Sequence, residues 1–404
     1  MVRDLLWQNI VLEPAATQVV DTPAFQRLRY VRQLGHAFLV YPGATHTRFE
    51  HALGAYGLAR RALAMLAERG RLAGLGERDT LLVRLGALLH DVGHYPFSHA
   101  LEESGLTSHE DLARDLLAAS PLADVLRGHG FADPATQLGA LIRGASDHPL
   151  AGLISGSTDL DKIDYLKRDA MMCGVPYGEV DVDRLLATLT VVELDGKRRV
   201  GIHEKGIAAL ESLLFAKYQM YRNVYWHHAV RSATAMFKRL VHEALVDRAL
   251  DPGTVAETTD DGLMHELLGA DRTGLASALR ERRLYKRALE VVPSELGLPV
   301  PLPAWLRGDA ARLATAEDAL GRGVGLGPAE LLIDFPHKDA MLGMDLPVAR
   351  SDGSVDRLTQ EGWPGRMDLP PFAARLAESA CRLRVFTRRP VAVSVERLGE
   401  VLAG

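Results

Sequence analysis

The sequence predicts a mainly α-helical protein with one short β-hairpin and a smaller α+β region after about residue 250. Leu and Ala recur at steps of three and four residues through the first two thirds of the chain, which is the period of a helix with one buried face. One segment instead alternates apolar and polar residues around Asp195-Gly196, a pair that favours a hairpin turn. The expected helical segments span residues 21–35, 47–69, 78–91, 108–119, 158–170 and 204–249.

The helix over residues 21–35 carries start and stop signals. In "DTPAFQRLRYVRQLG", Asp21 or Thr22 supplies the N-cap, Pro23 lies in the first turn, and Gly35 stands where the helix should end. The loop "HAFLVYPGATH" then leads to the next helix, which begins near residue 47.

The last third of the chain has a different texture, with Gly, Pro and Asp between short apolar runs. Three of these runs, "AELLIDFP", "MDLPVAR" and "CRLRVFT", predict strands. We therefore expect a helical core over residues 1–250 and an α+β region over residues 251–404.

Composition excludes several classes of protein. With 404 residues, 47% hydrophobic and 25% charged, the chain has enough apolar residues for a large core. Its formal net charge of -5 gives no reason to expect nucleic acid or an acidic membrane as a partner. The two cysteines are far apart in the sequence, and neither a signal peptide nor a run of about 20 apolar residues is present. These features predict a cytoplasmic protein without membrane segments.

The stretch "LGALLHDVGHYPFSHALEE" concentrates histidines around one carboxylate. His90, Asp91, His94 and His99 lie within ten positions, directly after an apolar run. Unpaired polar groups in such a buried helix would be costly to desolvate, and a metal ion is one way to satisfy them. His94 follows His90 by four residues, which places both on one face if the helix continues.

Two further segments place polar residues inside helical apolar patterns. "HTRFEHALG" carries Arg48 and His51, three residues apart. "STDLDKIDYLKRDA" carries several acidic residues on successive turns of one predicted helix. Both segments could supply the remaining ligands of a metal site.

In this order and spacing, "RFEHALG", "LLHDVGHYPFSH" and "LDKIDYLKRD" resemble the motifs of the HD-domain phosphohydrolases. The resemblance is strongest to the deoxynucleoside triphosphate (dNTP) triphosphohydrolases related to the enzyme that also carries a sterile-alpha-motif domain. It covers roughly residues 15–240 and implies a helical HD-domain core. We expect no sterile-alpha-motif domain before residue 15, and the C-terminal region matches only in general character.

The resemblance implies a metal site made of His51, His90, Asp91 and Asp161. Two imidazoles and two carboxylates suit Mn, Fe, Zn, Co or Ni better than an all-oxygen cage for Mg or Ca. Ligand types alone do not select among these metals, and Mg could accompany the substrate phosphates. For His51 alone, the alternative is a core histidine that bonds a backbone carbonyl.

The resemblance also implies a reaction, the hydrolysis of dNTPs at the α-phosphorus to deoxynucleoside and inorganic triphosphate. His94 matches an active-site histidine of the family. His109 matches a histidine proposed as general acid, and Glu102 lies near the position of its partner carboxylate. The alternative for His109 is an ordinary residue at a helix start, and we expect a structural role for His99.

Two cationic residues match phosphate-binding positions of the family. Arg48 would chelate two phosphate oxygens, while Lys162 would act as a point charge. The alternative for both is an ordinary ion pair on a helix, with Glu50 or Asp159 as the partner.

Three residues match positions that contact the sugar. Tyr165 matches an aromatic residue that packs on deoxyribose and blocks a ribose 2′-hydroxyl. Gln33 and Asp169 match the pair that binds the 3′-hydroxyl. Together they imply a preference for deoxyribose. A site that binds a hydroxyl discriminates strongly against a sugar that lacks it, whereas the steric exclusion of an extra 2′-hydroxyl gives weaker discrimination.

A nucleotide-activation site is implied by Asp21, Gln26 and Arg29, which match residues that bind the guanine of an activator in regulated relatives. The same residues would also make an ordinary helix cap and a solvated helix face. The aromatic-rich segment 217–233 resembles the family's helix beside the active site, with Trp226 near the position of a base-stacking tyrosine. Such a stripe is otherwise typical of a helix core.

Other functions stay open at this point. A second enzyme class comprises HD phosphodiesterases and nucleotidases that act on other nucleotides; Gln33, Tyr165 and Asp169 favour the dNTP reaction because they address the sugar. A regulator that binds nucleotide or nucleic acid with little turnover would use the basic stretch "CRLRVFTRRP". The net negative charge does not favour nucleic acid, and the resemblance implies a homo-oligomer.

Overall fold

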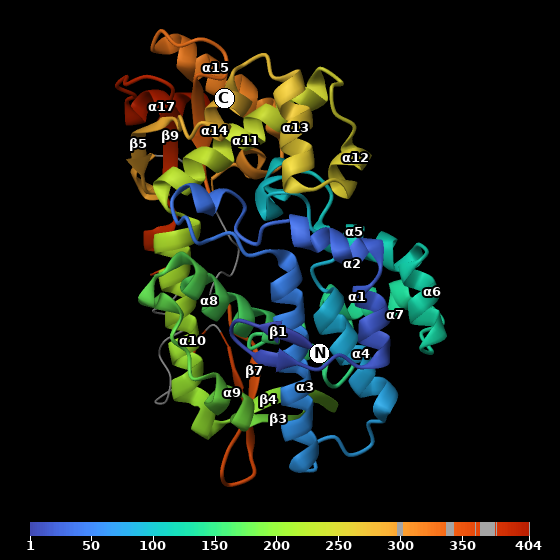
Figure 1. The fold of residues 1–404 in the computed structure, drawn as a ribbon. Coiled ribbons are helices and arrows are strands. Elements are labelled where there is room, and N and C mark those ends of the chain that lie inside the picture. The colour runs from blue at the N-terminus through green and yellow to red at the C-terminus, as the bar shows by residue number, and fades with distance from the viewer. Residues whose placement is uncertain (297–301, 337–342, 360, 364–375, 377, 404) are drawn as a thin grey trace.

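The computed structural model describes residues 1–296, 302–336, 343–359, 361–363, 376 and 378–403. The molecule is longer than it is wide (Figure 1). Helices α3, α4, α8 and α10 fill its lower part, and most segments from α11 onward gather at the upper end. Among the described residues, every helix is too short or too polar to cross a lipid bilayer. The predicted mainly α-helical fold is confirmed.

Four helices build the part of the molecule that positions the site, and the predicted helical segments account for them. The longest is α3, at whose start the Glu50 carboxylate accepts the backbone N–H of Thr47 at 2.8 Å and also its hydroxyl. Its small residues allow α4 and α8 to pack closely against it. The bounds are Arg48–Glu68 for α3, Glu77–Leu89 for α4, Leu160–Cys173 for α8 and Ile207–Met220 for α10.

Shorter helices surround these four. In the first half of the chain they are α1 (Pro14–Val20), α2 (Pro23–Gln26), α5 (His109–Ala118), α6 (Leu122–Gly128), α7 (Pro134–Ile142) and α9 (Val182–Thr188). Later in the chain they are α11 (His228–Val246), α12 (Pro252–Glu257), α13 (Asp260–Ala270), α14 (Leu275–Arg280), α15 (Ala310–Gly323) and α17 (Val395–Ala403).

Single 3-10 turns link many of these elements. They are η1 (Arg27–Tyr30), η2 (Gly35–Leu39), η3 (Ser98–Ala100), η4 (Glu102–Ser104), η5 (Ala151–Leu153), η6 (Pro176–Gly178), η7 (Glu204–Gly206), η9 (Pro293–Leu296) and η10 (Ala304–Arg307), while η8 (Tyr221–Tyr225) is a π-helical turn.

The predicted helix over residues 21–35 is wrong in length. Thr22, one of the two residues predicted as N-cap, does cap α2. However, α2 is followed directly by the 3-10 turn η1, which ends at Tyr30. The next residues pair with the segment before α3: the N–H of Gln33 donates to the carbonyl of His46 at 3.0 Å. These tertiary partners outweigh the local helix signal. Gly35 begins η2, a 3-10 turn inside the predicted loop.

The predicted helix over residues 204–249 is also interrupted. It divides into α10, the π-helical turn η8 and α11, with Trp226 and His227 between the last two. The His227 side chain accepts a hydrogen bond from the N–H of Ala229 and so caps α11. The wide turn reorients the chain so that Tyr225 faces α8, where its hydroxyl donates to Asp169.

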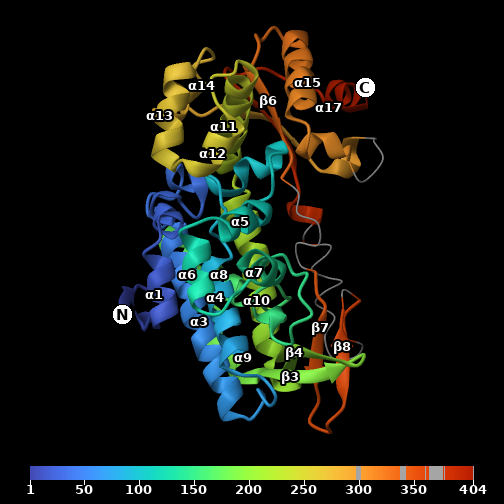
Figure 2. The ribbon, with the colours of Figure 1, turned by 90° about the vertical axis from the view of Figure 1, so that its right-hand side faces the viewer.

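The predicted hairpin is present and becomes part of a larger sheet. Strands β3 (Leu189–Leu194) and β4 (Lys197–His203) pair antiparallel, with Val191 opposite Val200. Asp195 and Gly196 have φ angles of 54° and 73°, as this tight turn requires. Strand β7 (Leu346–Ala349) pairs parallel to β4, and β8 (Val355–Leu358) completes the order β3-β4-β7-β8 (Figure 2).

Two smaller sheets complete the fold. One is the N-terminal pair β1 (Val2–Asp4) and β2 (Gln8–Ile10), and the other has the order β5-β9-β6. The three strands predicted in the last third are β6 (Leu331–Asp334), β7 and β9 (Leu383–Thr387), whereas β5 (Lys286–Val291) and β8 were not predicted. The boundary near residue 250 stays a prediction, and the pairing of β4 with β7 crosses it.

Candidate metal centre and active site

Three helices bring candidate metal ligands to one point. His51 lies one turn into α3, and His90 follows the last residue of α4. Asp161 lies in the first turn of α8, which begins where the Asp159 side chain accepts the N–H of Lys162 at 2.9 Å. Because α3 packs against both other helices, their side chains converge at its N-terminal end.

The distances between these groups match those around a single ion. His51 Nε2 lies 3.1 Å from His90 Nε2 and 3.0 Å from Asp161 Oδ1, and donor atoms of the three residues all lie within 4.8 Å of one another. Asp91 approaches both imidazoles, at 3.5 Å from His51 and 3.4 Å from His90. Ligand atoms held at about 2.0–2.2 Å from one ion lie roughly 3.0–3.5 Å apart. The structure therefore brings together all four predicted ligands.

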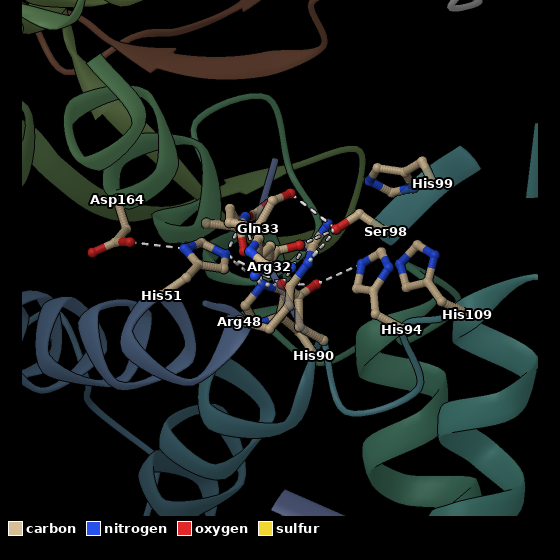
Figure 3. Close-up of polar contacts among 12 residues, drawn as sticks. Arg32, Gln33, Arg48, His51, His90, His94, Ser98, His99, His109 and Asp164 are labelled. Atoms are coloured by element: carbon tan, nitrogen blue, oxygen red, sulfur yellow. Dashed lines mark hydrogen bonds and ion pairs between the residues drawn. The ribbon is translucent and has the colours of Figure 1, made fainter. Parts of the chain in front are cut away.

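The hydrogen bonds of the two imidazoles direct their lone pairs to the centre. His90 Nδ1 donates to the carbonyl of Ala87 at 2.8 Å, and His51 Nδ1 donates to Asp164 Oδ2 at 2.7 Å. The two Nε2 atoms then face each other, as Figure 3 shows, and a metal ion would take the place of the proton held there. Burial would lower the pKa of His51, but hydrogen bonds to Asp161 and Asp164 raise it to about 10. The centre thus favours an added positive charge, and the donor set fits a divalent metal ion.

Asp164 is a functional candidate that sequence analysis missed. It is fully buried, and both of its oxygens accept hydrogen bonds from Arg168 at 2.9 Å. It also lies on the far side of the His51 ring from His90 (Figure 3). A carboxylate in this position fixes the ring and strengthens its basicity toward a metal. The signal available in the sequence was its place one helical turn after Asp161 on α8.

Replacing Asp164 by asparagine is expected to weaken metal binding roughly 10- to 100-fold, because the amide does not hold the His51 proton as a carboxylate does. Competition with a chelator measures this affinity. Asp4→Asn is the matched control, since Asp4 also pairs with Arg168, at 2.9 Å, and does not contact His51. Equal metal affinity in wild type and Asp164→Asn would contradict the assigned role.

The sequence predicted that His90 and Asp91 lie within a helix over residues 78–91. In the structure they follow its end instead. Helix α4 ends at Leu89, and a tight turn follows in which the N–H of His94 donates to the carbonyl of Asp91 at 3.1 Å. The reason is the close approach of α5: a Cβ on Gly93 would lie 2.2 Å from the His109 carbonyl oxygen. This approach places His94 beside His109.

A second group of titratable side chains adjoins the metal centre. His94 Nε2 contacts Asp91 at 3.0 Å, and His109 Nδ1 contacts both Glu102 oxygens at 3.0 and 3.1 Å. The rings of His94 and His109 stack at 3.8 Å with 14° between their planes (Figure 3). Because lone pairs lie in the ring planes, stacked rings do not aim both at one ion. The group is better suited to holding protons than to holding a second metal.

His99, for which a structural role was expected, lies near the same carboxylate. Its side chain is 55% exposed, and its Nδ1 lies 3.5 Å from Glu102. Its ring centre lies 4.7 Å from that of His94 and 5.4 Å from that of His109. His99 therefore lies beside this group, on the side open to solvent, and its structural role stays a prediction.

The charges of this group differ from one ring to the next. Burial and the nearby Arg48 hold the pKa of His94 well below its usual range, so this ring is neutral. Burial would also lower the pKa of His109, but the hydrogen bond and charge of Glu102 outweigh it and raise that pKa. Burial opposes ionisation of Glu102, whose pKa is nevertheless lowered by His109 and His99. His109 is thus the ring that carries a proton.

The two predicted phosphate-binding cations already have partners. Arg48 donates to Asp91 Oδ2 at 2.6 Å and to the Ser98 hydroxyl at 3.2 Å, and does not pair with Glu50, which caps α3 instead. Lys162 forms an ion pair with Asp159, as the alternative interpretation expected, and also donates to the carbonyl of Gly156 at 2.7 Å. Arg48 thus contacts a candidate metal ligand, and Lys162 directly follows one, Asp161, in the chain.

The predicted sugar-binding residues are connected to one another through His46 and Tyr225. Asp169 is buried and accepts hydrogen bonds from the Tyr225 hydroxyl and from His46 Nε2, both at 2.7 Å. Gln33 bonds the His46 carbonyl through its backbone, and its side-chain oxygen is buried without a partner in the described part of the chain. Tyr165 lies with its ring centre 6.4 Å from both the His51 and Tyr225 rings. His46 and Tyr225 were missed by sequence analysis.

Other predicted residues have internal partners. Gln26 donates to the carbonyl of Val20 at 2.7 Å and accepts from Arg29 at 2.8 Å, while the Arg29 guanidinium lies 3.5 Å above the Phe49 ring. Asp21 follows the last residue of α1, and its backbone N–H donates to the carbonyl of Thr17 in that helix. Trp226, near the predicted base-stacking position, is instead buried and packs against Tyr221 at 5.3 Å.

Two family models match this chain. The HD domain matches residues 48–168, which include all four candidate ligands, and the HD associated region matches residues 180–361. The chain belongs to the HD-domain phosphohydrolase family. The His90-Asp91 pair lies within the residues that match the HD domain. HD domains bind divalent metals, and the donor set at this centre fits such an ion.

Several known proteins are similar to this HD-domain protein. An uncharacterized protein of Methanocaldococcus jannaschii is 36% identical over 307 residues, 76% of this chain and 62% of that protein. The deoxynucleoside triphosphate triphosphohydrolase SAMHD1 of Gallus gallus is 26% identical over 374 residues, 78% of this chain and 60% of that protein. A solved structure of a hypothetical protein from Aquifex aeolicus covers 96% of both chains with a TM-score of 0.72 and 27% identity.

The chain spans between 42% and 62% of the length of the curated relatives that it matches. The HD-domain match begins at Arg48, so the residues of the predicted activator site lie before it. The match to the HD associated region covers the hairpin and much of the last third of the chain.

Proposed function

We propose that this HD-domain protein hydrolyses dNTPs to deoxynucleoside and inorganic triphosphate with a divalent transition metal at His51, His90, Asp91 and Asp161. The candidates for the metal are Mn, Fe, Zn, Co and Ni, with Mg on the substrate phosphates. The name of the SAMHD1 relatives, at 26–29% identity, supports the same reaction.

The observation that carries the proposal is a polar site for a sugar next to the metal centre. Asp161, Tyr165 and Asp169 follow one another at successive turns of α8. The end of this series is the buried carboxylate of Asp169, which keeps acceptor capacity. His46 connects it to the backbone of Gln33, whose side-chain oxygen is buried without a partner in the described part of the chain. Such groups gain from a bound hydroxyl, because buried polar atoms are costly when unpaired. A site for a phosphate chain alone would not need them.

The reaction follows from the groups on each side of this centre. A divalent ion held by the four ligands would lower the pKa of a water molecule and polarise a phosphoryl oxygen. The water molecule gives up one proton to the solvent, its oxygen bonds to the α-phosphorus, and the bond from that phosphorus to the 5′-oxygen breaks. His109, protonated and held through Nδ1 by Glu102, has Nε2 available to give its proton to the departing 5′-oxygen.

The basic stretch near the C-terminus gives less support to a nucleic-acid-binding regulator. Arg384 is buried and pairs with Glu290 at 2.7 Å, and Arg388 pairs with Glu330 at 3.0 Å. Arg389 donates to the carbonyl of Gly325 at 2.5 Å. Residues that bind phosphates in nucleic acid are normally exposed and unpaired.

Product analysis tests the proposal. Metal-loaded protein is incubated with dGTP, with GTP and with mixed dNTPs, and the products are separated by chromatography. The expected products are deoxynucleoside and triphosphate, and activity only in the mixture would indicate nucleotide activation. Mono- or pyrophosphate products would instead favour a nucleotidase or phosphodiesterase, and no turnover with any metal would favour a regulator. Activation at Asp21, Gln26 and Arg29, a homo-oligomer and a cytoplasmic location stay predictions.

Replacing Tyr165 by alanine is expected to lower the ratio of kcat/KM for dGTP over GTP about 10-fold or more, because the ring would no longer block a 2′-hydroxyl. Tyr30→Ala is the control, since Tyr30 is 65% exposed and far from α8 in the sequence. The two nucleotides are compared in steady-state assays. An unchanged ratio would show that another residue sets the sugar preference.

A further inference from the structure

The loop between α4 and η3 has an uncommon backbone conformation. Phe97 and Ser98 have φ angles of 57° and 60°, in the left-handed region that residues other than glycine rarely adopt. Two such residues in succession persist only where their surroundings hold them. We call residues 92–98 the histidine loop, because His94 lies within it. Its partners come from distant parts of the chain.

Asp260, the first residue of α13, is one of these partners. Its buried carboxylate accepts the N–H of Phe97 at 2.8 Å through Oδ1. Through Oδ2 it accepts the backbone N–H of Arg32 at 3.0 Å and the Arg32 guanidinium at 3.2 Å. One carboxylate therefore joins the histidine loop to the segment that carries Gln33.

Ser98 extends this connection to the metal centre. Its hydroxyl lies 2.8 Å from the carbonyl of Arg32 and 2.9 Å from that of Gln33, and it accepts from Arg48 Nε at 3.2 Å. Arg48 in turn pairs with Asp91. Figure 3 shows Ser98 and Arg32 beside Arg48. Asp260 is thus linked to a phosphate-binding candidate through two intervening hydrogen-bonded residues.

Arg27 holds the other end of the histidine loop. Its guanidinium donates to the carbonyls of His94 at 2.6 Å, Val92 at 3.5 Å and Thr258 at 2.9 Å. Burial lowers the pKa of Arg27 to about 10, although Asp260 and Glu257 oppose this shift. This partly buried cation bonds backbone carbonyls on both sides and so joins the loop to the segment between α12 and α13.

We propose that Asp260 and Arg27 are positioning residues, through which the segment at residues 258–260 holds His94 and Arg48 in the geometry that phosphate cleavage needs. The inference rests on the proposed function for its effect on turnover. Neither residue touches the metal donors or the sugar-binding residues. Both act through the histidine loop, and displacing a catalytic group by about 1 Å can cost roughly 100-fold in rate.

Hydrogen exchange and kinetics together test the proposal. In Asp260→Ala, the amides of the histidine loop are expected to exchange at least about 10-fold faster, because the Phe97 N–H loses its acceptor. The kcat for dGTP is expected to fall roughly 10- to 100-fold, with KM within about threefold of wild type and metal content unchanged. Asp261→Ala is the matched control: it removes the same charge from the same turn of α13, at an exposed position.

Unchanged exchange in the loop, or faster exchange with unchanged kcat, would overturn the proposal. Asp260→Asn keeps one acceptor for Phe97 and is expected to give an intermediate exchange rate, so it serves if the alanine variant does not fold. Arg27→Lys keeps the charge but loses the forked donor that bonds the carbonyls of Val92 and His94. In this variant the amides of the histidine loop are expected to exchange faster in the same assay. If wild type does not release triphosphate, the proposed function fails, and the exchange results still decide whether the loop is held by these residues.

Discussion

Replacing Asp161 by alanine is expected to lower turnover at least about a thousandfold and to remove most of the bound metal. A metal ion contributes several kcal/mol to charge stabilisation in the transition state, and about 1.4 kcal/mol corresponds to a factor of ten in rate. Asp161 is the most exposed of the four donors, with 32% of its side chain accessible, against 0% for His51. Its loss therefore disturbs packing least.

Metal content and steady-state rates of purified protein measure this effect. Asp183→Ala is the matched control, because Asp183 is 83% exposed, lies on α9 and pairs with Arg61. The control is expected to keep both activity and metal. A variant at Asp161 that retains full activity would show that the centre does not hold the catalytic ion.

Replacing Glu102 by glutamine is expected to move the alkaline limb of the pH-rate profile to lower pH. Burial would lower the pKa of His109, but Glu102 outweighs it, so the folded protein keeps His109 protonated above its usual pKa of about 6.5. A general acid works in its protonated form, and activity is lost as the pH rises through its pKa. Without the negative charge this loss comes at lower pH, so the rate falls more at about pH 8 than at about pH 6.

The same role predicts that His109→Ala lowers kcat roughly 100- to 10,000-fold, with metal content unchanged. Rates between about pH 5 and pH 9 for wild type and both variants give the comparison. Glu110→Gln is the control, because Glu110 contacts the same ring at the longer distance of 3.6 Å and is more exposed. An alkaline limb that stays in place in Glu102→Gln would remove His109 from the role of acid.

The elements that carry the metal donors could be predicted because their signals are local. Helices α3 and α8 have an apolar period, and the side chains of Glu50 and Asp159 satisfy backbone N–H groups at their starts. The spacing of "RFEHALG", "LLHDVGHYPFSH" and "LDKIDYLKRD" then indicated the family, and with it the residues that the structure brings together. The hairpin at Asp195-Gly196 had an equally local signal.

Features that depend on distant partners were not predictable in this way. The segment after Tyr30 leaves the helix because its backbone pairs with residues 46–48 and with Asp260. Tyr225 reaches Asp169 only because a π-helical turn interrupts the long helix. Asp164 looked like one more acidic residue on a helix, and its buried contact with His51 became visible only when α3 and α8 were packed together.

Hydrolysis of dGTP in water labelled with heavy oxygen tests the central claim most directly. Attack on the α-phosphorus with release of the 5′-oxygen places the label in inorganic triphosphate and leaves deoxyguanosine unlabelled. Mass spectrometry of the separated products is expected to show this distribution. Label in orthophosphate, pyrophosphate or the deoxynucleoside would contradict the account, because bond cleavage would then occur at another atom.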